Sequence, residues 1–381
     1  MGLDSKTRTG RYLKNTEIFF KWMVLVWFVV LGGIKRCRDN FDPRKIRRVL
    51  FVRHDKLGDM IISLPIFHNL KRLMPNIEID VLCGRDNHMI ISHDPHISNI
   101  MYYKKKPLAD LKRILHMRKR RYDAVVDMTF GESVTATILL SLIGPGSFKL
   151  GVGKDRLKQF FDSVVPPEAV EGPHIIRTTA SILKLFGISL DDCNLIPRMY
   201  LVEEDEAKAT EFLKPLRAKH EMLIGINLSA GRPARTWPVE RYVEFLKMFR
   251  SAYPDAAIIL SSAPNERGKI DEVMRTHKEN VYYVPEGYSI REIAGLLKHL
   301  DFLLTPDTSI GHIASCVDLP SLAMYPGNME NFAIWEPFNP CVRAINSPDF
   351  YRIEYLPVEP VYEAFCRVIE EEKNEPVAAR E

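Results

Sequence analysis

The sequence predicts an α/β fold in which two doubly wound parallel sheets face one another across a cleft. The chain has 381 residues, the length of two ordinary domains or of one large α/β unit. Short β-branched and aromatic runs alternate with helix-like segments and polar turns, and this alternation occurs in two separate series. With 46% hydrophobic and 27% charged residues, the composition excludes a disordered or collagenous protein.

The first series begins at Arg48. Residues 48–53 (RVLFVR) are typical of a buried parallel strand, and a polar turn, His54 to Gly58, follows them. From Asp59 onward apolar side chains recur at helical spacing, so a helix is expected there. Residues 77–83 and 122–128 are expected to form further strands.

The second series begins near residue 222. Strands are expected at residues 222–228, 256–261, 281–284, 302–305 and 322–325, and a helix is expected from about Val239. Residues 195–206 contain Pro197 and an acidic cluster, and they are interpreted as a linker entering a helix. Ligands of such sheets bind where the carboxyl ends of the strands meet a cleft.

The first 47 residues form an arm whose charge differs from that of the rest. Residues 1–48 hold 12 Lys and Arg against 4 Asp and Glu, a net of +8, whereas the remaining 333 residues hold 41 against 45, a net of −4. Residues 18–34 are apolar except for Lys21, basic residues flank them on both sides, and Trp22 and Trp27 suit a membrane boundary. We therefore expect a membrane-associating helix, which either spans the bilayer or lies in one leaflet.

Three other interpretations of the arm are weaker. A secretory signal lacks a small-x-small cleavage site before the next basic cluster, and a buried core helix fits poorly between two basic flanks. Nucleic-acid binding is not expected, because no groove-reading motif accompanies the charge. The larger basic cluster follows the apolar stretch, so the body is expected to face the cytoplasm at the inner membrane.

Metal and disulfide chemistry find little support in the sequence. The six cysteines include no C-x-x-C pair, which favours reduced thiols in a cytosolic setting. There is no D-x-D motif and no P-loop, and His93-Asp94-Pro95-His96 lies in an expected loop without a third ligand nearby. Neither a catalytic metal nor a cofactor is expected.

The turn after the first strand is the first candidate site. Asp59 lies at the start of the expected helix, where a carboxylate can either cap the helix or act as a general base. Gly58 before it allows close approach of the backbone, and Arg53 ends the strand on the same side of the cleft. From these residues alone both interpretations of Asp59 stay open.

Two further turns occupy equivalent places in the second series. Residues 229–238 (SAGRPARTWP) carry two arginines, which suit phosphate recognition but are also common on solvated surfaces. Residues 305–314 (TPDTSIGHIA) place Asp307 and two hydroxyls at a helix start, a ready anion site. Asp307 can equally be only a cap, and His312 only a packed helix residue.

Taken together and in order, these turns resemble glycosyltransferase family 9, the lipopolysaccharide heptosyltransferases. The resemblance runs from about Arg48 to Glu372. It depends on VLFVRHDKLGDMIISLPIFHNLKRLMPNIEIDVL, on the R-T-W-P element, and on DTSIGHIASCVDLPSLAMYPG, which is similar to the family's D-[ST]-x-x-x-H-x-A motif. The family implies a GT-B fold with an acceptor domain, here residues 48–198, and a nucleotide-sugar donor domain, here residues 199–381.

The resemblance also implies a reaction and roles for individual residues. It implies inverting, metal-independent transfer of a sugar from a nucleotide sugar, ADP-heptose in named members, to a lipid-linked acceptor such as lipopolysaccharide core. Asp59 matches the catalytic carboxylate, and Arg235 matches a basic position, often lysine, that neutralises the leaving diphosphate. Arg53 and Gly58 belong to the acceptor-side turn. The residues expected to bind the donor are Ser229, Glu266, Asp307, Thr308, Gly311 and His312.

Two departures from the family pattern concern the donor side. The chain has Tyr325-Pro326-Gly327-Asn328 where members commonly have F-G-P-T, and Arg235 replaces the usual lysine. These differences leave the identity of the sugar open. The alternatives are a transferase of the same fold that uses another nucleotide sugar for a different surface glycan, and a catalytically idle, membrane-tethered binding protein. The expected partners are a nucleotide sugar, a lipid-linked glycan and an anionic membrane surface.

Overall fold

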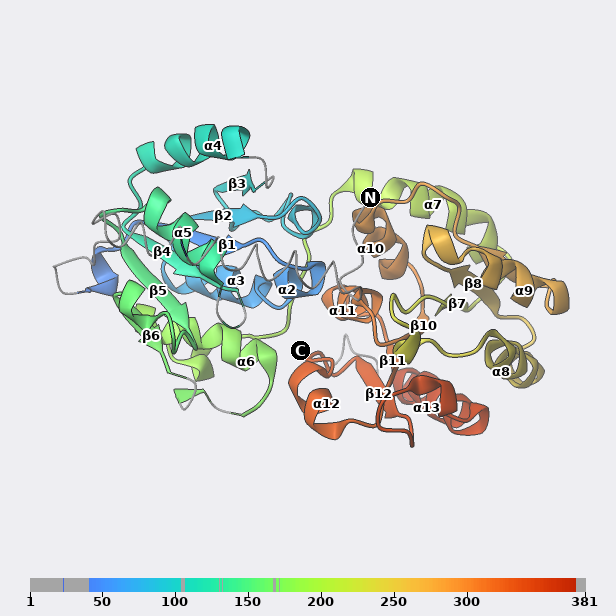
Figure 1. The fold of residues 1–381 in the computed structure, drawn as a ribbon. Helices are drawn as coiled ribbons and strands as arrows, with labels where there is room; N and C mark the ends of the chain where they lie inside the picture. Colours follow the sequence, from blue (N-terminus) through green and yellow to red (C-terminus); the bar gives the residue numbers. More distant parts are fainter. Residues whose placement is uncertain are drawn as a thin grey trace.

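The computed structural model describes residues 23, 41–103, 107–129, 131, 133–166, 169–170 and 172–374. The chain divides into two α/β halves that lie side by side, with helices α2 (Leu57–Ile61) and α11 (Ser309–Cys316) between them (Figure 1). The apolar segment expected at residues 18–34 lies outside the described residues, apart from Met23. Within the described part of the chain, no helix is long and apolar enough to cross a membrane.

The first half is built on a six-stranded parallel sheet in the order β3-β2-β1-β4-β5-β6. Its strands are β1 (Arg48–Arg53), β2 (Glu78–Cys83), β3 (Asn99–Tyr102), β4 (Ala124–Asp127), β5 (Phe148–Val152) and β6 (Ser163–Val165). Strand order reverses between β1 and β4, so the crevice for a ligand opens beyond the carboxyl ends of these two strands.

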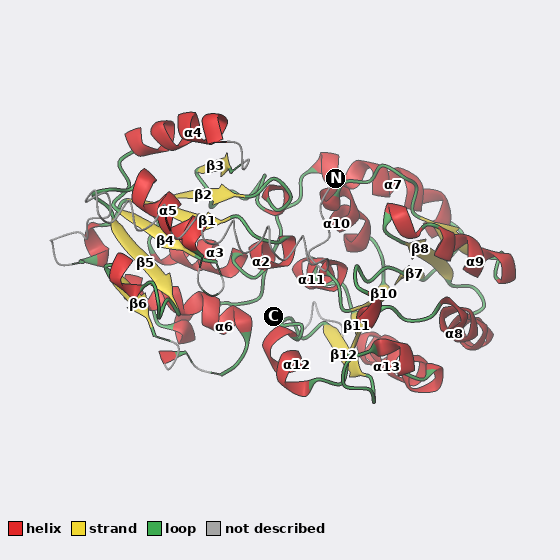
Figure 2. Cartoon of the chain, in the orientation of Figure 1, coloured by secondary structure: helices red, strands yellow, loops and turns green. Residues whose placement is uncertain are grey.

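Helices cover both faces of this first sheet (Figure 2). The α-helices are α2, α3 (Leu64–Leu73), α4 (Pro107–Lys119), α5 (Val134–Ile143) and α6 (Ile175–Ala180). Short 3-10 turns are η1 (Pro43–Lys45), η2 (His88–Ile90), η3 (Lys158–Phe160), η5 (Ser181–Phe186) and η6 (Leu190–Asp192). Along β1, Val49 and Phe51 enter one apolar cluster while Leu50 and Val52 enter another, as strand alternation requires.

The second half repeats the same topology, with a parallel sheet in the order β12-β11-β10-β7-β8-β9. Its strands are β7 (Leu223–Asn227), β8 (Ala257–Ser261), β9 (Val281–Tyr283), β10 (Phe302–Pro306), β11 (Ser321–Tyr325) and β12 (Val342–Asn346). The strand order reverses between β7 and β10. The carboxyl ends of these two strands therefore frame the second ligand crevice.

Helices also flank the second sheet on both faces. They are α7 (Glu203–Arg217), α8 (Val239–Ala252), α9 (Gly268–Thr276), α10 (Ile290–Lys298), α11, α12 (Met329–Trp335) and α13 (Val358–Asn374). The 3-10 turns are η7 (Pro233–Arg235), η8 (Pro264–Glu266) and η9 (Ile353–Tyr355). The apolar core under α8 and α13 includes Trp237, which is fully buried.

The two halves are joined by apolar and polar contacts. One apolar cluster includes residues of both halves, among them Phe51 and Ile313. The buried Arg291 of α10 forms an ion pair with Asp205 and donates to the backbone oxygen of Met89 in the first half at 2.9 Å. These contacts hold the two crevices opposite one another, so the expected arrangement of two Rossmann-like halves about a central cleft is confirmed.

Candidate active site in the cleft

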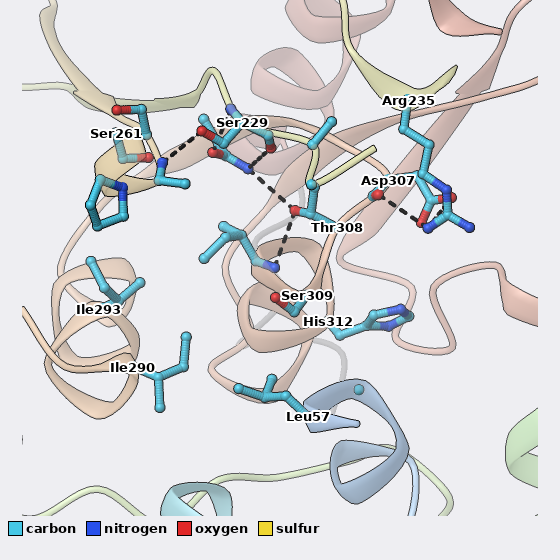
Figure 3. A pocket seen from close by; sticks show the side chains of 18 of the residues that line it. Leu57, Ser229, Arg235, Ser261, Ile290, Ile293, Asp307, Thr308, Ser309 and His312 are labelled. Carbon is cyan, nitrogen blue, oxygen red and sulfur yellow. Dashed lines mark hydrogen bonds and ion pairs between the residues drawn. The ribbon is translucent and has the colours of Figure 1, made fainter. Parts of the chain in front are cut away.

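A cavity of about 1090 Å³ lies between the carboxyl ends of the two sheets. The first half contributes the turn after β1, and the second half contributes the loops after β7, β8, β9 and β10 and residues of α10, α11 and α12 (Figure 3). The predicted site residues that line it are Gly58, Asp59, Ser229, Arg235, Asp307, Thr308 and His312. Three turns that are far apart in sequence therefore meet in one cavity.

Asp59 comes from the short helix α2, which begins at Leu57 and not at Asp59 as the sequence pattern suggested. Asp59 is the third residue of the helix, and its Oδ2 accepts a hydrogen bond from the backbone N–H of Lys56 at 3.1 Å. The carboxylate thus stabilises the helix start. It also lies in the cavity wall, with its side chain 14% exposed, so the capping role does not remove it from the site.

Arg53 holds this turn from behind. Its side chain is fully buried and is not part of the cavity wall. Its Nε donates to the backbone oxygen of Asp59 at 2.8 Å, and Nη1 donates to the backbone oxygen of Met128. Its guanidinium also lies 3.6 Å from Asp59 Oδ1 and 3.4 Å from Asp55 Oδ2. Arg53 therefore positions the carboxylate of Asp59 and supplies positive charge beneath it.

Asp55 is a second carboxyl group behind the cavity wall, and the sequence did not single it out. Burial raises the pKa of Asp55 to about 6, although the attraction of Arg53 opposes the shift and the nearby charge of Asp59 adds to it. Two carboxyl groups thus compete for one buried guanidinium.

The loop after β7 presents Arg235 to the cavity because it is anchored on both sides. Trp237 is buried in the core, and its Nε1 donates to the backbone oxygen of Leu356 at 2.9 Å. On the other side, Gly231 adopts a φ of +64°, which turns the chain and favours glycine. The R-T-W-P element of the sequence is therefore an anchored segment whose arginine faces the cleft (Figure 3).

Arg235 is paired with Asp307 across two strand ends. Its Nη1 lies 3.0 Å from Asp307 Oδ2, with the arginine side chain 31% and the aspartate 6% exposed. Burial raises the pKa of Asp307, and the positive charges of Arg235 and Arg232 oppose that shift. The pair leaves part of the guanidinium open to the cavity, where its remaining donors can reach an anion.

Thr308 caps α11 and connects it to the neighbouring strand. Its Oγ1 accepts from the N–H of Ile310 at 3.2 Å and from Nδ2 of Asn227, at the end of β7, at 3.2 Å. The first turn of α11 lines the cavity at Ser309 and Ile310. The positive end of the helix dipole therefore faces the cavity close to Arg235 (Figure 3).

His312 lies one turn further along α11 and faces α2 of the first half. Burial lowers the pKa of His312 to about 4, the charges of Arg235 and His174 lower it further, and Asp59 opposes the shift. The imidazole is therefore neutral near pH 7, a hydrogen-bonding group and not a cation. A Cβ built on Gly58 would lie 3.9 Å from Cδ2 of His312, so these two residues face each other between the halves.

Ser229 lines the cavity and holds two neighbouring loops together. It lies after β7, is buried, and its Oγ accepts from the backbone N–H of Ala263 at 2.6 Å. This bond fixes the loop after β8 against the loop after β7, and residues of both loops line the cavity.

Two of the predicted donor residues do not line the cavity. Glu266 lies in η8 and pairs with Lys269 Nζ at 2.7 Å, although its neighbours Pro264 and Arg267 are in the wall. Gly311 is buried on the side of α11 that packs against β10, where an added Cβ would lie 3.4 Å from Thr305 Cγ2. Its hydrogen side chain permits close packing of the helix on the strand.

Apart from the prediction of Glu266 in the loop after β8, the sequence did not indicate the residues of the wall formed after β8 and β9. This wall consists of Ser261, Ser262, Ala263, Pro264, Arg267, Val284, Pro285, Glu286, Gly287 and Tyr288, with Ile290 and Ile293 of α10 below. Arg267 stacks over the ring of Tyr283 at 4.0 Å. The mixture of apolar side chains, hydroxyls and backbone groups is typical of a pocket for an organic ligand. This wall could have been found from the rule that ligands of parallel sheets bind beyond the carboxyl ends of the strands.

The His93–His96 segment acquires a third partner in the structure. Asp94 accepts from His68 Nε2 of α3 at 2.7 Å and from His96 Nδ1 at 2.9 Å, while His93 faces Asp205 instead. Donors bound to one tetrahedral zinc lie about 3.3 Å apart, given bonds of about 2.0 Å. The shorter distances are those of hydrogen bonds, and both imidazoles pack on the linker residue Tyr200. This cluster lies outside the cavity.

Comparison with known proteins finds a family and a fold that this chain matches. The family described as glycosyltransferase family 9 (heptosyltransferase) matches residues 111–354. Lipopolysaccharide heptosyltransferase 3 of Escherichia coli K12 is 22% identical over 294 residues, which cover 74% of this chain and 82% of that protein.

Solved structures of the same family share the fold. A family 9 glycosyltransferase from Veillonella parvula has a TM-score of 0.74 at 16% identity and covers 85% of this chain and 97% of its own. The E. coli heptosyltransferase WaaC with ADP has a TM-score of 0.67 at 18% identity, with 84% and 99% covered.

Proposed function

Because the chain belongs to glycosyltransferase family 9, the heptosyltransferase family, we propose that it transfers a heptose or a related sugar from ADP-heptose to a lipid-linked acceptor such as lipopolysaccharide core. The observation that carries the proposal is the placement of Asp59 on one wall of the cavity and of Arg235 with the first turn of α11 on the other. A base and an anion site then face each other across a space large enough for a nucleotide sugar.

The donor is proposed to bind to the second half. Its diphosphate would lie against Arg235 and the amino end of α11, since an arginine fork and helix amides both favour phosphate. Its nucleoside would lie along the wall after β8 and β9, which offers apolar contacts and polar backbone groups. The structure of the E. coli heptosyltransferase WaaC with ADP supports adenosine as this nucleoside.

Asp59 is proposed to act as the general base. The acceptor hydroxyl would approach the anomeric carbon from the first half and give its proton to the carboxylate as the new C–O bond forms. The bond from the anomeric carbon to the diphosphate oxygen breaks, the electron pair leaves with the diphosphate, and the configuration at the carbon inverts. Arg53, buried beneath, would keep the carboxylate in place during this step.

The charge that develops on the leaving diphosphate is proposed to be stabilised without a metal ion. Arg235 supplies a fixed positive charge, and the amino end of α11 supplies oriented N–H groups in the same wall. The neutral imidazole of His312 lies between α11 and α2, where it can hydrogen-bond to a sugar or phosphate oxygen without adding charge. Asp307 would hold Arg235 in place before the donor arrives.

A lipid-linked acceptor requires the enzyme to work at a bilayer. The net charge of +8 in residues 1–48 and the apolar residues 18–34 support attachment to the cytoplasmic face of the inner membrane through the arm. Confinement of enzyme and acceptor to one surface raises their effective concentration. Removal of residues 1–40 should convert the protein from a form that resists a salt wash of membranes to one that salt extracts. A truncated protein that still resists the wash would contradict attachment through the arm.

The test of the reaction is a transfer assay with the purified full chain. ADP-heptose, other ADP-sugars, UDP-sugars and a CMP-sugar would each be supplied with truncated lipopolysaccharide core acceptors, and the product mass would be read by mass spectrometry. We expect a mass increment of one heptose, with ADP released. Transfer only from a UDP- or CMP-sugar would favour the alternative of a different surface glycan. Binding without any transfer would favour the idle binding protein.

A further inference from the structure

We propose that the outer face of α4 is a second membrane-contact surface, which lies against an anionic phospholipid bilayer. The α4 outer face is defined as Leu111, Lys112, Leu115, His116, Arg118 and Lys119, all of which are exposed. The inference rests on the proposed function, because an enzyme that acts on a lipid-linked acceptor must work at a bilayer. It concerns a surface of the body that is separate from both the arm and the cleft.

The α4 outer face has an apolar centre within a basic border. The side chains of Leu111 and Leu115 lie one helical turn apart, with exposed fractions of 50% and 49%. Lys112 and His116 follow them on one side, and Arg118 and Lys119 complete the face toward the carboxyl end of the helix. Exposed leucines framed by cations are typical of helices that lie in the interface of an anionic membrane.

The exposure of these leucines is not a consequence of a loosely attached helix. The opposite side of α4 buries Met117 in the apolar cluster that covers β1 and β4, with Ile114 packed against it and α5 as its neighbour. Asp110 is also buried, and it pairs with Arg113 at 3.4 Å. The inner face of α4 is therefore already packed against the first half. Leu111 and Leu115 are additional apolar residues on its outer face.

The charge around the leucines is concentrated, and four of its exposed, described cations have no acidic partner among the described residues. Residues 104–121 contain nine Lys and Arg and one acidic residue, Asp110, a net of +8 that equals the net charge of residues 1–48. Arg120 is neutralised by Asp80 and Glu78, at 2.6 and 3.3 Å. In the part of the chain that the structure describes, no acidic side chain forms an ion pair with the exposed residues Lys112, Arg118, Lys119 and Arg121.

The position of α4 connects this face to the arm. At its carboxyl end, Arg48 of β1 donates to the backbone oxygen of Arg120 at 2.5 Å, so α4 ends beside the point where the arm joins the sheet. Arg44, Lys45 and Arg47 are exposed at that junction. Figure 1 shows α4 along the outer edge of the first half, away from the second half. An arm inserted in a bilayer and the α4 outer face can therefore contact the same membrane surface.

The pattern favours a bilayer over other partners. A nucleic acid would contact the cations through its phosphates, but it would not bury the two exposed leucines. A second copy of the same face would bring six Lys and Arg side chains together without intervening acids. A bilayer that contains anionic lipid satisfies both parts at once, because leucine enters the headgroup boundary while lysine and arginine contact phosphates.

The first test measures partition of the full chain to vesicles of mixed phosphatidylglycerol and phosphatidylcholine. The triple variant Lys112→Gln/Arg118→Gln/Lys119→Gln should bind at least about tenfold more weakly than wild type, because each cation near an anionic surface contributes about fivefold. Leu111→Gln/Leu115→Gln should also bind more weakly, with little change in salt dependence. The matched control is Lys247→Gln/Arg275→Gln/Lys278→Gln, which removes the same charge from exposed positions of the second half. Equal binding of the α4 triple variant and this control would overturn the proposal.

The second test locates the contact without relying on total affinity. Backbone amide hydrogen exchange of the full chain would be measured with the mixed vesicles and with vesicles of phosphatidylcholine alone. The mixed vesicles should slow exchange in residues 107–119 as well as in the arm. Slowing confined to residues 1–47 would overturn the proposal, as would tighter binding of α4 to duplex DNA than to vesicles at the same salt. Transfer to a deacylated, water-soluble acceptor should be unchanged in the α4 variants. Absence of that transfer in wild type would instead contradict the proposed function.

Discussion

Arg235 Nη1 lies 3.0 Å from Asp307 Oδ2 and 3.4 Å from the backbone oxygen of the same aspartate. The two residues come from loops after different strands, β7 and β10, at the point where the strand order of the second sheet reverses. Asp307 is buried and Arg235 is partly exposed, so the aspartate holds the arginine from the protein side and leaves the cavity side open. A cation fixed in this way need not reorganise when a diphosphate departs.

Arg235→Gln should therefore lower kcat by about 10²–10³-fold, the usual cost of losing one preorganised group that stabilises developing charge. Arg235→Lys should keep more activity than Arg235→Gln, because it retains the charge but loses the fork that contacts Asp307 and phosphate together. Steady-state kinetics with the purified full chain would check both variants. Arg275→Gln, on an exposed turn of α9, is the control and should leave kcat unchanged. Equal activity of all three variants would contradict a role in leaving-group stabilisation.

Asp59→Asn should abolish most transfer while leaving donor binding largely intact. The amide cannot accept a proton, but it can still take a hydrogen bond from the N–H of Lys56, so the start of α2 should persist. A loss in kcat of about 10²–10⁴-fold is expected for removal of a general base. Isothermal calorimetry with ADP should give a dissociation constant within a few-fold of wild type. Asp86→Asn, an exposed acid of the same half, is the control, and unchanged turnover of Asp59→Asn would remove the general-base role.

The sequence was sufficient to predict every inner strand of the two sheets except β5, and the edge strand β9, but not the other three edge strands. Strands β1, β2, β4, β7, β8 and β10 are buried along nearly their whole length, and such strands carry continuous apolar runs. The strands β3, β6 and β12 are at sheet edges and are only partly buried, so their sequences lack that signal. β5 was missed because it contains Gly151 and a buried lysine, Lys149.

The candidate site could likewise be predicted only in part from the sequence. The turns that carry Asp59, Arg235 and Asp307 follow predicted strands, and parallel strands bring such turns to one edge. The burial of Arg53 depends on Met128 and Asp55 around it, which pair with it only after folding. Likewise no local pattern tells whether the side chain of Glu266 turns toward the cavity or toward Lys269.

Gly58→Ala should be tolerated and should stabilise the protein slightly. An added Cβ would meet only Cδ2 of His312 at 3.9 Å, an ordinary contact, and Gly58 lies within α2 with a φ outside the left-handed region. Replacement of glycine by alanine within a helix contributes about 0.5–1 kcal/mol to the free energy of unfolding. Urea unfolding would measure it. A bulkier substitution, Gly58→Leu, should instead raise KM by filling the cavity. Strong destabilisation by Gly58→Ala would show that the sequence-based expectation of a close backbone approach was correct.

Removal of divalent metal should leave transfer undiminished. The positive charge needed at the diphosphate is supplied by Arg235 and by the amino end of α11, both of which line the cavity. Initial rates after dialysis against EDTA should match those of the untreated enzyme. Rates of Arg235→Gln with and without added Mg²⁺ form the second arm, since a metal-free site should gain little from the ion. A strict metal requirement in wild type would contradict the proposed mechanism.

The neutral imidazole of His312 should make stability depend on pH in a defined window. Burial lowers its pKa to about 4 in the folded protein from a model-compound value of 6.5. Above pH 6.5 the imidazole is neutral in both states, so its full contribution to stability is present. As pH falls from 6.5 toward 4, the unfolded chain binds a proton that the folded protein does not, and the contribution is lost.

By pH 4.5 the free energy of unfolding of wild type should have fallen by on the order of 2 kcal/mol more than that of His312→Gln. The other titrating groups are common to both proteins and cancel in this difference. Urea unfolding at pH 7 and pH 4.5, followed by tryptophan fluorescence, would measure it. Arg235→Gln removes a positive charge that lowers the pKa of His312, so in that background the difference should shrink. Parallel pH dependence of wild type and His312→Gln would show that the imidazole titrates normally and is not shielded between α11 and α2.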